Sequence, residues 1–167
     1  GALVVALAMV GCGQPADEAA DGHLVYVTPT PVGDNDFLEL GRLGTERAAE
    51  SHGMTFETLE ATDADSRRAH LEAAVEGDAD LIVMISFEFI DLAAEFAAAY
   101  PESQFALVDA CPEAEAPEGN LACATFREHE GAYLLGLMAG HLTETGQIGS
   151  VLALDIPFLH RWSDSFA

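Results

Sequence analysis

The sequence contains no lysine, and its only basic side chains besides histidine are six arginines. A Gly-Lys-Ser/Thr phosphate-binding loop is therefore excluded. With 29 acidic residues the formal net charge is −23, so there is no basic stripe to neutralise nucleic-acid phosphates, and nucleic acid is not expected as a partner. The acidity is typical of solubility in salty surroundings, and an acidic surface that binds cations is the alternative.

Other catalytic and cofactor motifs are also missing. No Gly-x-Gly-x-x-Gly follows the first expected strand, and no Gly-x-Ser-x-Gly elbow occurs. The six histidines do not fall at metal-ligand spacing. Glu128, His129 and Glu130 open an expected helix, on which neighbouring side chains diverge by about 100°. We therefore expect no catalytic residue, no metal and no cofactor, and the chain does not look like an enzyme.

The first segment, residues 1–12, has the pattern of an export signal. Residues 2–10 are uncharged and apolar but too few to span a bilayer. Gly11 and Cys12 after such a run resemble the bacterial lipobox, in which Cys12 would carry a diacylglyceryl group. Residues 13–23 are expected to form a flexible polar tether; a buried strand ending in an incidental cysteine is the alternative. The expected location is the cell membrane, lipid-anchored and facing the periplasm or the cell exterior.

Two further cysteines, Cys111 and Cys123, flank a stretch rich in Pro, Glu and Gly. An oxidising compartment outside the cytoplasm would permit a disulfide that closes this stretch. Two free, half-buried thiols are an equally open alternative at this point.

Strands and helices alternate from residue 23 onward. Continuous β-branched or apolar runs predict strands, and apolar residues at helical spacing, bounded by Gly or Pro, predict helices. The expected strands are 23–28, 54–59, 79–85, 103–108, 121–125 and 147–154, and the expected helices are 36–52, 63–76, 89–100 and 128–142. This alternation predicts an α/β fold with a doubly wound parallel sheet and helices on both faces.

In such sheets ligands gather at the carboxyl ends of the strands. The candidate ligand-binding residues there are the carboxylates Asp34 and Asp109, the amide Asn35 and the aromatic rings Phe37 and Phe87. Carboxylates accept hydrogen bonds from hydroxyl and N–H groups, and aromatic rings stack on flat apolar faces, so the set suits a sugar or a nucleoside. Phe37 is also in phase with core positions of its helix, and either aspartate could instead cap a helix or turn.

Three stretches carry a resemblance to a known family. The first is Asp34-Asn-Asp-Phe37-Leu38 with Gly44, and the second joins an apolar strand and Phe87 to Ala-Ala-Tyr-Pro101 and Phe105-Ala-Leu-Val-Asp109. The third runs from Asn120 through Phe-Arg-Glu-His-Glu-Gly-Ala-Tyr-Leu-Leu-Gly136 to Asp155-Ile-Pro157. Together they resemble the basic membrane protein family of bacterial lipoproteins, of the purine nucleoside receptor type.

The resemblance implies a type I periplasmic-binding-protein fold of two parallel-sheet lobes, the first at 24–123 and an incomplete second, with its hinge, at 124–167. It also implies an ABC permease and ATPase as partners and nucleosides as ligands. In this family pattern Phe37 would stack on the base, and Asp34 and Asp109 would form hydrogen bonds to the ligand. The family's usual Ser, Asn and Gly are replaced here by Asp36, Leu38 and Ser86. These departures put purine specificity in question.

Two alternative functions remain open at this point. One is a sugar or autoinducer receptor of the same architecture. The other is a surface-tethered enzyme of the nucleoside hydrolase type, which would use Asp34 and Asp109. Binding without release of the base distinguishes a receptor from such an enzyme.

The lipobox resemblance generates a prediction about membrane attachment. Because thioether attachment needs the Cys12 sulfur, Cys12→Ser in the full-length precursor is expected to move the protein from the membrane fraction to the soluble fraction. Cell fractionation and immunoblotting measure this, with Cys111→Ser as the control that retains the anchor. A Cys12→Ser protein that still sediments with membranes contradicts lipidation at Cys12.

Overall fold

The computed structural model describes residues 22–112 and 119–167. The chain divides into two compact units, of which the first ends at Cys123 and the second begins at Ala124. Cys12 and the expected signal segment lie outside the described residues. The assignment of 24–123 and 124–167 to two lobes stays a prediction.

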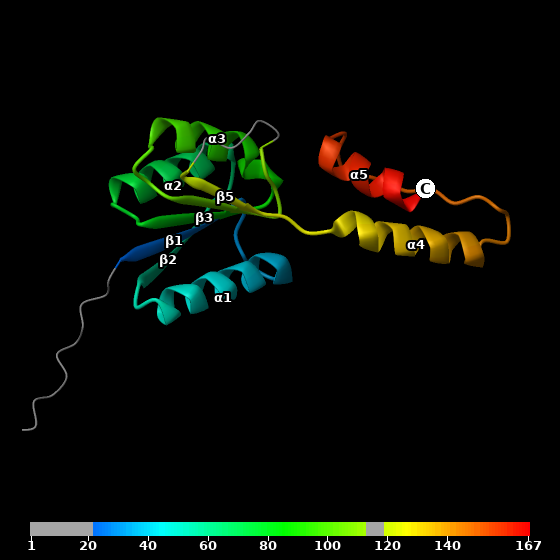
Figure 1. The fold of residues 1–167 in the computed structure, drawn as a ribbon, viewed down its shortest axis with the longest axis horizontal. Helices are drawn as coiled ribbons and strands as arrows, with labels where there is room; N and C mark the ends of the chain where they lie inside the picture. The colour runs from blue at the N-terminus through cyan, green and yellow to red at the C-terminus, as the bar shows by residue number, and fades with distance from the viewer. Residues whose placement is uncertain (1–21, 113–118) are drawn as a thin grey trace, which may run out of the picture. The chain divides into compact units, whose positions relative to one another are not determined.

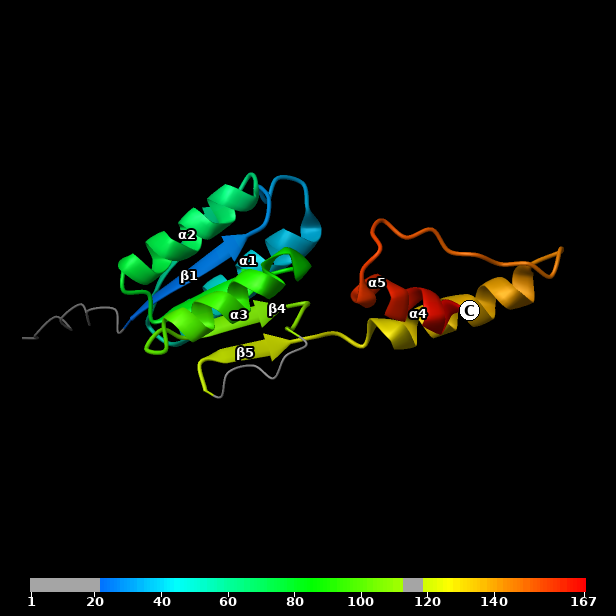
Figure 2. The ribbon, with the colours of Figure 1, turned by 90° about the horizontal axis from the view of Figure 1, so that it is seen from above.

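The first unit is built on a five-stranded sheet with strand order β2-β1-β3-β4-β5. Its strands are β1 His23–Thr28, β2 Thr55–Glu60, β3 Leu81–Ile85, β4 Phe105–Val108 and β5 Leu121–Ala124. β1 pairs in parallel with β2 and β3, and β3 pairs in parallel with β4. Figure 2 shows β5 running in the same direction beside β4. The predicted parallel α/β sheet is thus confirmed.

Helices cover both faces of this sheet (Figure 1). On one face lies α1 Asp36–Ser51, and on the other lie α2 Ala64–Glu76 and α3 Ile90–Ala99, which the short 3-10 turn η1 Phe87–Phe89 precedes. The core beneath α2 and α3 is formed mainly by Val25, Val27, Leu71, Ile82, Met84, Phe89, Phe96, Phe105 and Leu107. The core beneath α1 is formed by Leu24, Tyr26, Val32, Leu38, Ala49, Val83 and Ile85. Alternate residues of β1 and β3 therefore point into two different cores, which explains why both strands are apolar throughout.

A close approach between α1 and the sheet depends on one glycine. The Tyr26 hydroxyl, on a fully buried side chain, donates a 3.0 Å hydrogen bond to the Leu38 carbonyl of α1. Burial raises the pKa of the Tyr26 phenol above its usual range, and the Glu39 carboxylate adds to the effect, so the hydroxyl remains a donor. A methyl group at Gly41 would meet the Tyr26 hydroxyl oxygen and would lie 2.8 Å from Ile85 Cδ1.

The second unit contains two helices, α4 Glu128–Leu142 and α5 Pro157–Phe166. The predicted strand over 147–154 is wrong, because these residues have no regular secondary structure. A strand needs a hydrogen-bonded neighbour, and residues 124–167, all of which the structure describes, include no strand after β5. The apolar pattern is present, but Val151 is fully exposed.

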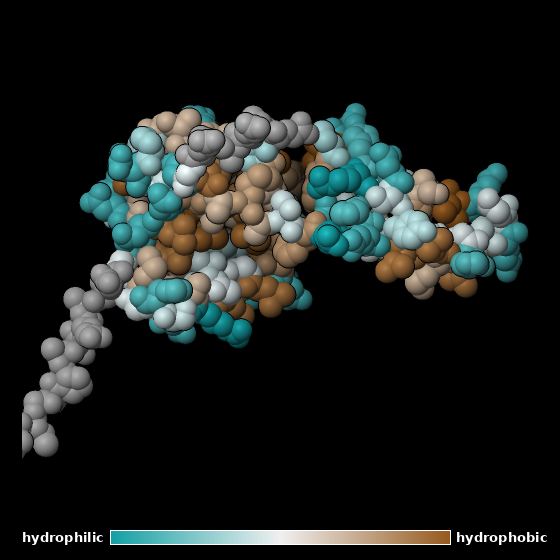
Figure 3. All heavy atoms as spheres, in the orientation of Figure 1, coloured by the Kyte–Doolittle hydropathy of each residue, from teal (hydrophilic) through white to brown (hydrophobic). Residues whose placement is uncertain are grey.

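Hydrophobic side chains are unusually exposed on the second unit (Figure 3). On α4 they are Tyr133, Leu134, Leu135, Leu137, Met138 and Leu142. A shallow hollow of roughly 350 Å³ lies between α4, residues 150–152 and Trp162. Within the two described ranges, no helix combines the length and the apolarity needed to cross a bilayer.

The packing at Gly41 can be tested with a matched pair of substitutions on α1. Gly41→Ala is expected to lower the free energy of unfolding by about 1–3 kcal/mol, because the added methyl overpacks the contact with Tyr26 and Ile85. Gly44→Ala is the control: its added methyl meets nothing within 4 Å, so better helix propensity should raise stability by up to about 1 kcal/mol. Urea denaturation measures both. Equal effects of the two substitutions contradict the close approach.

Candidate functional site

The carboxyl ends of three adjacent strands meet at one edge of the sheet. β1, β3 and β4 are parallel neighbours, with Val27 opposite Met84 and Ile85 opposite Val108. The segments that leave these strands therefore begin side by side. We define the strand-end edge as these segments, residues 29–37, 86–89 and 109–111; it contains all five predicted ligand-binding residues.

Contacts from neighbouring elements hold the segment that follows β1. The buried Thr28 hydroxyl donates to the Thr30 carbonyl at 2.8 Å. The buried Val32 amide donates to the Glu60 carboxylate at the end of β2, at 3.2 Å. This role of Glu60 was missed in the sequence analysis. The available signal was its position, because Glu60 ends the strand beside β1 and so belongs among the strand ends of a doubly wound sheet.

A second fixing contact comes from α2. The Arg67 guanidinium Nε donates to the Pro29 carbonyl at 3.3 Å. Nothing in the local sequence indicates this contact, because the two residues are brought together only by the crossover of α2. The segment after β1 is thus held from both β2 and α2, which orders the residues that lead into α1.

Asn35 has a structural role at this edge. Its side-chain oxygen accepts hydrogen bonds from the Phe37 and Leu38 amides at 3.1 and 3.3 Å, which caps the N-terminus of α1. Capping by an aspartate was the predicted alternative, and the structure gives the cap of α1 to Asn35, next to the exposed Asp34. That Asn35 and Asp34 contact a ligand stays a prediction.

Phe37 and Leu38 have opposite environments. The Phe37 side chain is 39% exposed, whereas Leu38 is 2% exposed and packs in the core with Tyr26. The alternative that Phe37 is a core residue is therefore wrong; Leu38 and Ala49 face inward from α1 instead. Phe37 presents an aromatic surface in the first turn of α1, at the edge where ligands bind in this type of sheet.

The segment after β3 contains a strained residue. Ser86 has φ 86° and ψ 161°, a region that is essentially restricted to glycine. Its amide donates to the Val108 carbonyl at 2.8 Å, and its hydroxyl donates to the Glu88 carboxylate at 2.6 Å. The resembling family has glycine here, and the dihedral angles supply the physical reason. Phe87, which follows, is partly buried against the core.

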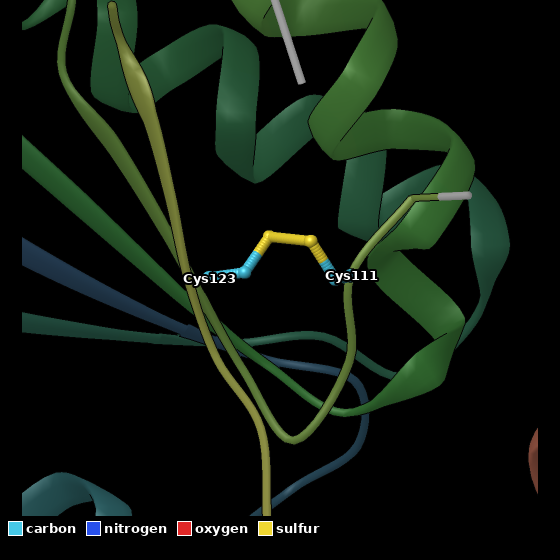
Figure 4. The surroundings of a disulfide bond; sticks show 2 residues. All are labelled: Cys111 and Cys123. Carbon is cyan, nitrogen blue, oxygen red and sulfur yellow. A yellow bond between two sulfur atoms is a disulfide. The ribbon is translucent and has the colours of Figure 1, made fainter. Parts of the chain in front are cut away.

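The segment after β4 is short and firmly attached. Asp109 is half-buried with φ 71°, a conformation that Asp tolerates better than most residues, and the next residue, Ala110, is buried. The structure joins Cys111 to Cys123 of β5 by a disulfide, with the Cα atoms 5.5 Å apart (Figure 4). This Cα separation lies within the usual range for a disulfide.

Asn120, which opens the third family-like stretch, supports α3. Its buried side-chain amide donates to the carbonyls of Ala97, Tyr100 and Ser103 at 3.0, 3.0 and 3.1 Å. These carbonyls lie at the end of α3 and in the turn before β4, where helical partners are lacking. The motif therefore begins with a residue that has a structural role, which its spacing did not reveal.

The strand-end edge is acidic. Asp34, Glu88 and Asp109 lie on its segments, and Glu60 adjoins it. In the part of the chain that the structure describes, no group of three or more His, Cys, Asp or Glu residues could hold a metal ion. Carboxylates and an exposed ring can accept hydrogen bonds and stack, which is recognition chemistry.

The family follows from a direct comparison. A model of the Bmp family, described as PnrA-like substrate-binding proteins of ABC transporters, matches residues 23–167. The chain belongs to this family. The family resemblance predicted from the sequence is thus confirmed.

Similar proteins are known from bacteria and archaea. Basic membrane protein A of Borreliella burgdorferi is 31% identical over 116 residues, which is 70% of this chain and 34% of that protein. An uncharacterised lipoprotein of Pyrococcus horikoshii is 33% identical over 134 residues, 78% of this chain and 33% of that protein. This Bmp-family chain therefore spans about a third of the length of each of these two relatives.

Solved structures show the same fold. A solute-binding protein of an ABC transporter system from Aeropyrum pernix K1 superposes with a TM-score of 0.69 at 28% identity, over 86% of this chain and 41% of that one. A solute-binding protein from Conexibacter woesei gives 0.58 at 18% identity, over 71% and 40%, and supports the fold alone. The predicted periplasmic-binding-protein fold class is confirmed by these likenesses.

The dihedral angles of Ser86 generate a prediction about stability. At an ordinary position glycine is less stable than alanine by roughly 0.5–1 kcal/mol. At Ser86 the order should reverse, with Ser86→Gly more stable than Ser86→Ala by about 1–2 kcal/mol, because only glycine relieves the strain. Chemical denaturation of both variants measures the difference.

A matched control for Ser86 lies in α1. Ser51 ends that helix and has no positive φ, so Ser51→Ala should be more stable than Ser51→Gly. The account of Ser86 fails if alanine is preferred to glycine at both positions.

Proposed function

We propose that the protein is an extracytoplasmic solute-binding lipoprotein that captures a nucleoside-like small molecule for an ABC importer. The observation that carries this proposal is the exposure of Phe37 at the strand-end edge, where the Asp34 and Asp109 segments also begin. Membership of a substrate-binding family supports the proposal. The ligand that we favour has a flat ring and hydroxyl or N–H groups.

The chemistry of the edge favours this class of ligand over an ion. When a flat apolar face covers an exposed aromatic ring, both surfaces leave water and the free energy of the complex falls. Asp34 and Asp109 can each accept hydrogen bonds from ribose hydroxyls or ring N–H groups, and charged acceptors make the stronger hydrogen bonds. A phosphorylated ligand would face like charges at Asp34, Glu88 and Asp109.

The proposed partners follow from the family. A substrate-binding protein of an ABC transporter delivers its ligand to a permease and its ATPase, and the relative from Pyrococcus horikoshii is named a lipoprotein. We therefore propose a lipid anchor at Cys12 and a location at the outer surface of a cell membrane. Capture would occur by closure of two lobes, with the first at 24–123 and the second beginning at 124, and no covalent bond would change.

Incubation of the full-length protein with inosine distinguishes capture from hydrolysis. A receptor binds inosine and releases it intact after denaturation. An enzyme of the nucleoside hydrolase type liberates hypoxanthine, which chromatography detects. Hypoxanthine that appears with wild-type protein and is lost in Asp109→Asn would contradict the proposed function.

Two substitutions test the proposed site. Asp109→Ala is expected to weaken binding by about 1.5–3 kcal/mol, or one to two orders of magnitude in Kd, because a hydrogen bond to a charged group is lost. Phe37→Ala should have a comparable cost through lost stacking and burial. Calorimetry against a panel of nucleosides and sugars measures both, and circular dichroism checks that the variants fold.

Each variant has a control away from the edge. Leu40→Ala removes an exposed apolar side chain from the next turn of α1, and Glu102→Ala removes an exposed carboxylate from the turn before β4, at the opposite end of that strand. Both controls should leave the affinity unchanged. If folded Asp109→Ala and Phe37→Ala also bind like the wild type, the two residues are structural and the site lies elsewhere.

A further inference from the structure

The disulfide occupies a particular place in the first unit. Cys111 lies two residues after Asp109, and Cys123 is the last residue of the first compact unit. The bridge therefore connects the segment that contains a proposed ligand-binding carboxylate to the point where the chain leaves this unit. Figure 4 shows the bridge spanning from that segment to β5.

β5 is an edge strand of the sheet, with β4 as its neighbour. At its start, the Asn120 carbonyl accepts a 2.8 Å hydrogen bond from the Phe105 amide, and the Asn120 side chain is anchored to the end of α3. Near its end, Cys123 is held by the disulfide. An edge strand of four residues has few ladder hydrogen bonds, so a covalent attachment near its end restrains it strongly.

Asp109 lies between two fixed points. On one side, the Ser86 amide donates to the carbonyl of Val108, the last residue of β4, at 2.8 Å. On the other side, Ala110 is buried and Cys111 is covalently bridged. Asp109 itself has φ 71°, a conformation that a non-glycine residue keeps only when its surroundings impose it.

We propose that Cys111 and Cys123 are positioning residues for Asp109, and that the affinity for ligand depends on their disulfide being oxidised. This inference rests on the proposed function, because it concerns the same ligand site. The bridge would restrict Asp109 to its binding conformation before the ligand arrives, so that less conformational entropy is lost on binding.

Reduction of the bridge is chemically simple. A dithiol reductant such as dithiothreitol supplies two electrons and two protons, the S–S bond breaks, two cysteine thiols form, and the reductant becomes a cyclic disulfide. Cys111 is exposed and Cys123 is half-buried. The 167 residues contain three cysteines, so a Cys12→Ser substitution leaves the two cysteines of the bridge as the only ones within this stretch.

A first measurement needs no ligand. In the full-length Cys12→Ser protein, hydrogen exchange is compared between the oxidised form, the dithiothreitol-reduced form and the Cys111→Ser/Cys123→Ser variant. We expect amides of β5 and of residues 109–111 to exchange about tenfold faster or more without the bridge, while β1 and β3 keep their protection. Unchanged exchange at residues 109–111 overturns the positioning role. Alkylation without reduction, followed by mass spectrometry, verifies the oxidised form. Labelling of both thiols in the exported protein also overturns the positioning role.

The second measurement is a double-mutant cycle on ligand affinity. In the protein that retains Asp109, reduction is expected to raise the Kd for the tightest-binding nucleoside or sugar of the panel by about fivefold or more. Coupling free energies between interacting residues or sites typically have this size. In Asp109→Ala, reduction should change the Kd little, because the group that the bridge positions is gone. A bridge that only stabilises the fold would instead weaken both proteins equally or neither, and that result overturns the proposal.

The failure of this inference is distinguishable from failure of the proposed function. If the oxidised protein binds no member of the panel, the proposed ligand class is wrong, and with it the dependence of affinity on the bridge. If the oxidised protein binds and the reduced protein binds equally well, the proposed function stands and the positioning role is wrong.

Discussion

Burial of β1 and β3 on both faces is the constraint on which the rest of the structure depends. Val25 and Val27 of β1 pack under α2 and α3, whereas Leu24 and Tyr26 pack under α1. A strand that is buried on both sides requires helices on both sides, and right-handed crossovers then bring each strand back parallel to the last. The carboxyl ends of β1, β3 and β4 consequently meet at one edge. The topology alone therefore brings the segments of the strand-end edge together, whatever side chains they carry.

The strand-end edge combines satisfied structural polar groups with strained backbone. Asn35 caps α1, and Glu60 holds the Val32 amide. Ser86 and Asp109 keep positive φ angles at the ends of neighbouring strands. Strain of this kind persists where surrounding contacts impose it, and binding sites are common places for it. An exposed ring, half-buried and exposed carboxylates and a fixed backbone are the properties that a preorganised receptor site needs.

Much of the first unit could be predicted from the sequence, because strands such as Leu81–Ile85 are continuous apolar runs and helices such as Asp36–Ser51 are bounded by clear signals. Periodicity was less informative on α1, where Phe37 is exposed and Leu38 is buried. The contacts of Glu60 and Arg67 arise only from the crossover that brings distant segments together. The strand predicted over 147–154 is absent, and residues 124–167 include no other strand after β5 with which it could form a ladder. Local pattern thus identifies elements, whereas tertiary contacts decide what their end residues do.

Our central proposal is that a small molecule is held, unchanged, at the ends of β1, β3 and β4. The most direct test is a crystal structure of the full-length protein grown with the nucleoside or sugar that binds it most tightly. The account predicts an intact ligand whose ring stacks on Phe37 and whose hydroxyl or N–H group lies within hydrogen-bonding distance of the Asp109 carboxylate. A ligand bound elsewhere, for example in the hollow beside Trp162 on the second unit, would contradict it.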